Sequence, residues 1–163
     1  MSIDLTTDPL VSKAKSATDE LLQSDVSQLY TTLQMRRELI ASDPAAAGDF
    51  GVDATHAAAD MGPDALAALR EFGARYFASV SEQVYGLICG SDADDAGLRN
   101  KLLSVFTDKS TFAALLAGII VTQIGLAPAL AAVVAALVVK LFAAPAYSIM
   151  CDMWGRALKP ATA

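Results

Sequence analysis

The feature that most constrains this chain is a long uncharged segment near its carboxyl end. No charged residue lies between Lys109 and Lys140. The segment Gly125-Leu126-Ala127-Pro128 divides this run into two apolar halves, residues 111–126 and 129–144. Each half forms about 24 Å of helix at about 1.5 Å per residue. The pattern is typical of a hydrophobic helical hairpin.

Two environments can hold such a hairpin, because a helix that is apolar all round avoids water equally in a membrane or in a protein core. The flanking charges favour the membrane: Lys101 and Lys109 precede the hairpin, and Arg156 and Lys159 follow it. The turn carries no charge that would have to cross a bilayer. Each half is a little short of the ~30 Å hydrocarbon layer, a mismatch that thinning of the bilayer absorbs.

The main prediction is therefore a non-enzymatic, membrane-associated helical protein whose hairpin inserts in or permeabilises a membrane, as an anchor or as a pore. The N-terminal helices would regulate it or oligomerise it. We expect two parts, an acidic amphipathic body over residues 1–109 and the hairpin with a short C-terminal helix and tail over residues 110–163. Membrane lipid and further copies of the chain are the expected partners.

The candidate functional residues follow from this interpretation. The hairpin residues expected in the membrane or in the core are Phe112, Leu116, Gly118, Ile120, Gln123, Gly125, Pro128, Leu130, Val134, Leu137, Lys140 and Phe142. The residues expected to anchor the hairpin at the membrane interface are Lys109, Tyr147, Trp154, Arg156 and Lys159. The stem of Lys140 can extend to that interface. Gln123 is a polar residue within an apolar helix, and we expect its side chain to need a hydrogen-bond partner across the hairpin or between subunits.

The alternative is a soluble, homo-oligomeric helical interaction or structural protein. Its hairpin would be buried in the core or in a subunit interface, and its acidic N-terminal helices would bind a protein partner. Periodicity does not separate this alternative from the membrane prediction, because both require the same apolar helices.

The rest of the chain predicts an all-α fold, a helical bundle without sustained period-two alternation. Asp8-Pro9 opens a helical stripe that runs to about residue 41, as one helix or as two joined near Ser24-Asp25. Residues 42–63 are rich in Gly, Pro, Asp and Ala and predict a flexible connector. A second amphipathic helix is expected from about residue 64 to residue 89, where Gly90 ends it.

The charge distribution excludes one class of partner. Residues 1–109 carry nine Lys and Arg against seventeen Asp and Glu, and residues 110–163 carry three against one. An acidic surface repels phosphate backbones, so we expect no nucleic-acid binding. The adjacent pair Arg36-Arg37 is interpreted as a solvated face.

The cysteines and the first residues bear on location. Cys89 and Cys151 lie in apolar helical contexts, which predicts buried reduced thiols. The first residues lack the pattern of a secretory signal. We expect a protein at the cytoplasmic side of the cell membrane that is not secreted, or, in the alternative, one dissolved in the cytoplasm.

No constellation of residues predicts catalysis, a cofactor or a metal. Asp92, Asp94 and Asp95 resemble the start of a calcium loop, but Ala96 and Leu103 stand where a loop of that type needs oxygen ligands. His56 is the single histidine and is interpreted as a surface residue. The prediction is that the protein is not an enzyme.

Overall fold

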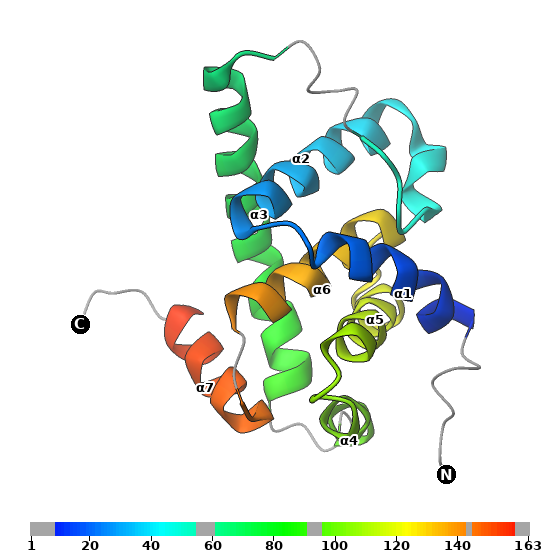
Figure 1. Cartoon of the computed structure of the whole chain (residues 1–163), viewed down its shortest axis with the longest axis vertical. Helices are drawn as coiled ribbons and strands as arrows, with labels where there is room; N and C mark the ends of the chain where they lie inside the picture. Colours follow the sequence, from blue (N-terminus) through cyan, green and yellow to red (C-terminus); the bar gives the residue numbers. More distant parts are fainter. Residues whose placement is uncertain (1–8, 55–60, 91–95, 143–144, 159–163) are drawn as a thin grey trace.

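The computed structural model describes residues 9–54, 61–90, 96–142 and 145–158 of the chain. Every regular element in these ranges is helical, so the predicted all-α class is confirmed (Figure 1). The elements are α1 (Pro9–Leu21), α2 (Val26–Ser42), the 3₁₀ turn η1 (Pro44–Gly48), α3 (Pro63–Cys89), α4 (Ala96–Ser104), α5 (Lys109–Ile119), the π-helical segment η4 (Ile120–Ile124), α6 (Pro128–Leu141) and α7 (Tyr147–Leu158).

The N-terminal stripe forms two helices because Asp25 starts a new one. The Asp25 carboxylate accepts the backbone N–H of Gln28 at 2.8 Å, and the Gln28 side chain accepts the backbone N–H of Asp25 at 3.0 Å. The backbone N–H groups at the start of a helix have no carbonyl partner within that helix, and this reciprocal capping box satisfies two of them. The chain therefore turns between α1 and α2, as one of the two sequence predictions proposed.

Helix α3 is the longest described element and crosses α2 at close range. It begins at Pro63, whose missing N–H costs nothing in the first turn, and ends before Gly90. A Cβ added to Gly73 would lie 1.9 Å from the backbone oxygen of Tyr30. Only a glycine allows this approach, so Gly73 sets how closely the two helices pack.

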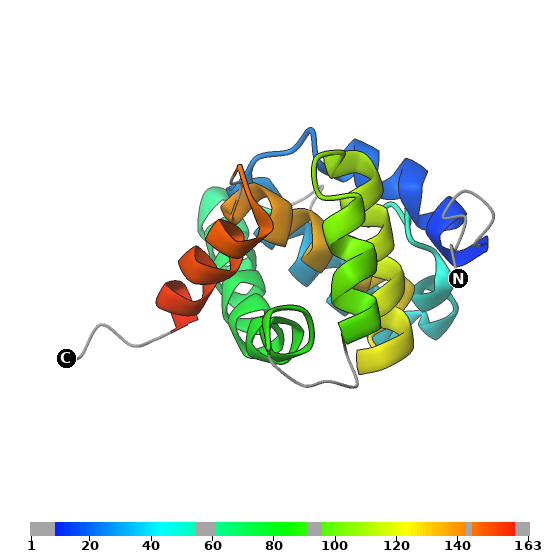
Figure 2. The ribbon, with the colours of Figure 1, turned by 90° about the horizontal axis from the view of Figure 1, so that it is seen from below.

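The uncharged segment forms α5, η4 and α6. Asp108 caps α5, and the helix widens into η4 before Gly125, whose φ of +79° is left-handed, turns the chain. Pro128 then opens α6. Helices α5 and α6 pack against each other, α1 packs against both, and α2 packs against α6 (Figures 1 and 2).

The core is built around this apolar pair. Every residue from Phe112 to Ile120 and from Ala129 to Val139 is buried. Residues of α1, α2, α3 and α7 complete the same apolar cluster, among them Val11, Leu33, Val84 and Trp154. The apolar pair is thus enclosed by other helices of its own chain.

This enclosure corrects the main prediction from the sequence. No helix in the described ranges combines the length and the apolar character that crossing a bilayer requires. The predictions of a membrane-inserting hairpin, a transmembrane helix and a pore are therefore wrong. The physical reason is that α5 and α6 run for only 11 and 14 residues, and that buried residues of α1, α2, α3 and α7 pack around them.

Candidate functional site

The predicted hairpin residues divide between the core and its exposed turn. Eight are buried, namely Phe112, Leu116, Gly118, Ile120, Leu130, Val134, Leu137 and Phe142. Gln123, Gly125 and Lys140 are exposed, and Pro128 is half-buried. Gln123 lies at the end of the helix in η4, where water reaches its side chain, so it does not need the buried hydrogen-bond partner that we expected.

The predicted membrane anchors face the protein itself. Trp154 is fully buried, and its Nε1–H donates to Ser81 Oγ at 2.7 Å. The Tyr147 hydroxyl donates to the backbone oxygen of Ile88, and burial raises the pKa of Tyr147 to about 12.

The charged members of this set also have partners within the chain. The Lys109 ammonium lies 3.3 Å from the centre of the Phe106 ring, and Arg156 pairs with Asp152 at 3.0 Å on the surface. Lys159 lies outside the described residues. The two aromatic members of the set contact α3, and the role of the set as interfacial anchors stays a prediction from the sequence.

The two cysteines are bonded to each other, so the prediction of reduced thiols is wrong. The Cys89–Cys151 disulfide joins the last residue of α3 to α7 across 62 positions of sequence. Apolar neighbours in sequence indicated burial, but they carried no information on which helices meet. Disulfides persist in oxidising compartments and are rare in the cytosol, so the bond bears directly on location, which stays a prediction.

Arg36 is a buried charge that the sequence did not indicate. Its side chain is 5% exposed, and Nη1 donates to the backbone oxygens of Phe50 at 2.7 Å and Ala129 at 2.8 Å. Burial lowers the pKa of Arg36 to about 10, partly offset by the charges of Asp49, Glu20 and Asp53. Arg36 thereby ties α2 to the loop after η1 and to the start of α6.

Arg37, the other member of the pair, behaves differently. Its guanidinium lies 3.9 Å from the centre of the Tyr76 ring on α3. This cation–π contact is half-buried and adds to the packing of α2 on α3. The prediction of a solvated face for both arginines was therefore wrong for Arg36.

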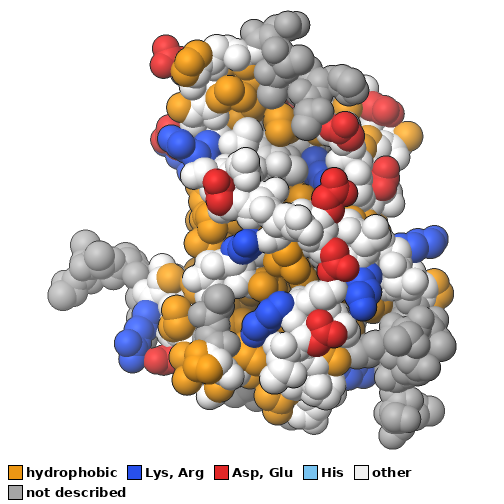
Figure 3. Space-filling view, viewed as in Figure 1, with side chains coloured by type: hydrophobic (Ala, Val, Ile, Leu, Met, Phe, Trp, Pro, Cys, Tyr) orange, Lys and Arg blue, Asp and Glu red, His pale blue; other side chains and the backbone are white. Residues whose placement is uncertain are grey.

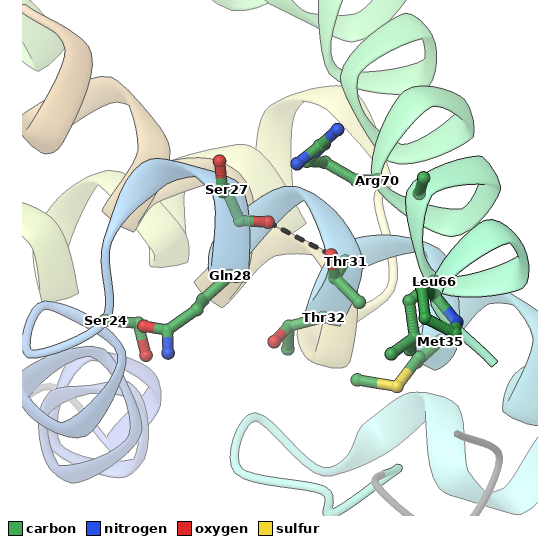
Figure 4. Close-up of a pocket in the computed structure, with 10 residues that line it drawn as sticks. Ser24, Ser27, Gln28, Thr31, Thr32, Met35, Leu66 and Arg70 are labelled. Carbon is green, nitrogen blue, oxygen red and sulfur yellow. Dashed lines mark hydrogen bonds between the residues drawn. The ribbon is translucent and has the colours of Figure 1, made fainter. Parts of the chain in front are cut away.

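A groove of about 550 Å³ runs between α2 and the first turns of α3 (Figure 4). Hydroxyl and amide side chains of α2 line one wall, and Leu66 and Arg70 come from α3. Figure 4 shows Met35 and Leu66 together at one end, with Thr31 bonded to the backbone of Ser27. The exposed lining of the groove is more apolar than polar, because Met35, Leu66 and the hydrocarbon parts of the neighbouring side chains contribute to it.

Beside this groove, the first turns of α3 present a face that no other described element of the chain covers. We define the α3 outer face as Asp64, Ala65, Ala68, Phe72 and Arg75, which share one side of the helix at spacings of three and four. Phe72 is 49% exposed, an uncommon state for a phenylalanine. Figure 3 shows hydrophobic and charged side chains side by side over this end of the molecule.

The charges of the outer face are held by short-range contacts on α3 itself. Arg75 pairs with Glu71 at 2.5 Å, with both side chains more than 60% exposed (68% and 63%). The Arg75 guanidinium also lies 5.9 Å from the centre of the Phe72 ring. Exposed pairs of this kind contribute little stability, so Arg75 is free to exchange its partner on binding.

Among the described residues, no group of three His, Cys, Asp or Glu side chains is placed to hold a metal ion. His56 and the acidic segment Asp92–Asp95, which we did not expect to bind calcium, lie outside those residues. Comparison with known proteins gave no match to a family model, a curated protein or a solved structure.

Proposed function

We propose that this protein is a soluble helical interaction protein without enzymatic chemistry, and that it self-associates through the α3 outer face. The hydrophobic hairpin serves as its core, in a bundle completed by the outer helices. Two observations support this proposal. Helices α5 and α6 are enclosed within one chain. The α3 outer face, with its exposed Phe72, is not covered by other described residues.

The α3 outer face is complementary to itself. When two copies of α3 pack antiparallel about a two-fold axis near residue 70, Phe72 of each copy meets the small Ala68 of the other. The same axis brings Arg75 of each copy to Asp64 of the other. A two-fold interface requires such self-matching, in size and in charge, because each patch contacts its own image.

A second copy would also cover part of a second hollow between α2 and α3, which Asp64 and Ala68 line together with Tyr30. An interface built mainly from one helix of each copy lies at the small end of specific interfaces, below about 1,200 Å². We therefore expect a dimer whose population depends on protein concentration.

Sedimentation of the full chain over a range of concentrations, without detergent, tests this proposal. Asp64→Arg and Arg75→Asp each place like charges opposite one another and should raise the dissociation constant. The double variant restores opposite charges and should recover dimerisation. Phe72→Asp should abolish it, whereas Leu103→Asp, at a 58% exposed position on α4, should leave it unchanged.

Two results would refute the proposal. One is a monomer at every concentration tested. The other is a dimer that the Phe72 and charge variants leave intact, which would place the contact elsewhere.

A further inference from the structure

Helix α7 is held on the outside of the molecule by one covalent bond and a few side chains (Figures 1 and 2). Its buried residues are Met150 and Trp154, while Ile149 and Met153 on its other side are 45% and 42% exposed. The helix packs mainly on α3. It is therefore an attached strap rather than a central part of the core.

The bond that holds this strap joins two residues that are not fully enclosed. Cys89 and Cys151 are both half-buried rather than enclosed. Cys89 ends α3, and Cys151 lies one turn into α7, between the contacts of Tyr147 and Trp154. Because neither residue is fully enclosed, a small thiolate needs only a local opening of α7 to attack the bond.

We propose that the Cys89–Cys151 disulfide is a redox-controlled latch, whose reduction by a dithiol releases α7 from α3 while the remaining helices stay folded. One thiolate of the dithiol attacks a cysteine sulfur, and the other cysteine leaves as a thiolate and takes up a proton. The second thiol of the dithiol, as a thiolate, then attacks the dithiol's own sulfur in the mixed disulfide, and the remaining cysteine leaves as a thiolate and takes up a proton. Two electrons pass to the protein, and the dithiol becomes a cyclic disulfide.

Helix α7 and the rest of the molecule differ in how they are stabilised. The helices α1, α2, α5 and α6 pack on one another around the buried apolar pair and do not depend on α7 for most of their contacts. In contrast, a helix of twelve residues is marginal on its own in water. Without the covalent bond, noncovalent contacts alone oppose its release, mainly those of Trp154, Tyr147 and Met150.

Trp154 is itself the reporter for this event. It is the only tryptophan of the chain, and in the latched state it is fully buried, stacked on Phe142 with ring centres 5.2 Å apart. On reduction of the full chain with dithiothreitol, we expect its emission to shift to longer wavelength and its quenching by acrylamide to rise severalfold. The far-UV circular dichroism should lose no more helix than α7 contains. Reoxidation with oxidised glutathione should reverse both changes.

The matched control is the double variant Cys89→Ser/Cys151→Ser, which should show the released fluorescence with or without dithiothreitol. Should that variant fail to fold, reduction of the folded wild type still tests the latch. Unchanged quenching after both thiols titrate would show that side-chain contacts alone hold α7. Cooperative loss of all helical structure on reduction would show that the disulfide stabilises the whole fold rather than α7 alone. Titration of two free thiols before reduction would show that the disulfide does not form. Each of these three results overturns the proposal.

Discussion

At the scale of single residues, the most informative position is Arg36. Burying an arginine costs less when its donors find acceptors, and Nη1 of Arg36 donates to two backbone oxygens from separate parts of the chain, while its Nε is buried without a hydrogen-bond partner. The sequence showed two adjacent arginines on an amphipathic helix and could not separate them, because their different surroundings depend on where η1 and α6 lie.

Removing the Arg36 side chain should lower the stability of the whole fold. We expect Arg36→Ala to reduce the free energy of unfolding by about 2–4 kcal/mol, because it leaves a cavity and an unpaired backbone oxygen at Phe50. Urea denaturation measures this change. Arg156→Ala, at a side chain that is 78% exposed, should change stability by no more than about 0.5 kcal/mol. Equal effects of the two variants would contradict the role given to Arg36.

Asp108 makes a residue-scale contribution that depends on pH. Hydrogen bonds from the Thr111 hydroxyl at 2.7 Å and backbone N–H hold the pKa of Asp108 below its ordinary value of 3.8. The folded protein therefore favours the charged carboxylate. Its contribution is complete above pH 3.8 and is lost as the pH falls through the pKa of the folded state.

Asp108→Ala should accordingly lower the free energy of unfolding by about 1 kcal/mol at neutral pH through loss of the helix cap. Thermal unfolding of both proteins over a series of pH values checks the dependence. The difference between them should shrink toward strongly acidic pH, and a difference that stays constant there would rule out the cap as its cause.

At the scale of elements, the bounds of the helices were largely predictable, because caps, prolines and apolar stripes are local features. The predicted break near Asp25 and the predicted helix from 64 to 89 correspond closely to α2 and α3. The widening of α5 into η4 was not predictable, since no Gly or Pro in Ile120–Ile124 marks a change of helix type. The disulfide, the α2–α3 groove and the α3 outer face were also missed, because each depends on which helices meet.

The turn after η4 gives a prediction with an internal control. Gly125 has open space around the position of a Cβ, so the cost of Gly125→Ala comes from its left-handed backbone alone. We expect a loss of about 1–2 kcal/mol. Gly86 also has open space but lies within α3, so Gly86→Ala should instead stabilise the protein by about 0.5–1 kcal/mol. Thermal unfolding should show shifts of opposite sign, and shifts of the same sign would be incompatible with this account.

At the scale of the whole molecule, the central finding is where the apolar pair is buried. The sequence identified both apolar helices but left two environments open for them. Deciding between these required the combined apolar area of α1, α2, α3 and α7, which no single stripe indicates.

Because α5 and α6 are enclosed, we expect truncation of their buried side chains to lower the free energy of unfolding in buffer without detergent. Leu116 on α5 is fully buried, so Leu116→Ala should leave a cavity and cost about 3 kcal/mol of unfolding free energy. Leu103→Ala, at the 58% exposed position on α4, should cost no more than about 0.5 kcal/mol. Denaturant titration without detergent measures both, and a Leu116 variant as stable as the Leu103 variant would show that the pair does not form the core.

The covalent bond between α3 and α7 also divides the polypeptide mechanically. In the oxidised protein the 62-residue separation from Cys89 to Cys151 forms a closed ring that holds α4, α5 and α6. A force applied to the two chain ends passes through the disulfide and does not stretch the ring. At ~3.3 Å per residue, the backbone within the ring would otherwise extend by about 200 Å. Optical-tweezer unfolding should release that length only after reduction, so the apolar pair belongs to the part of the chain that tension cannot extend.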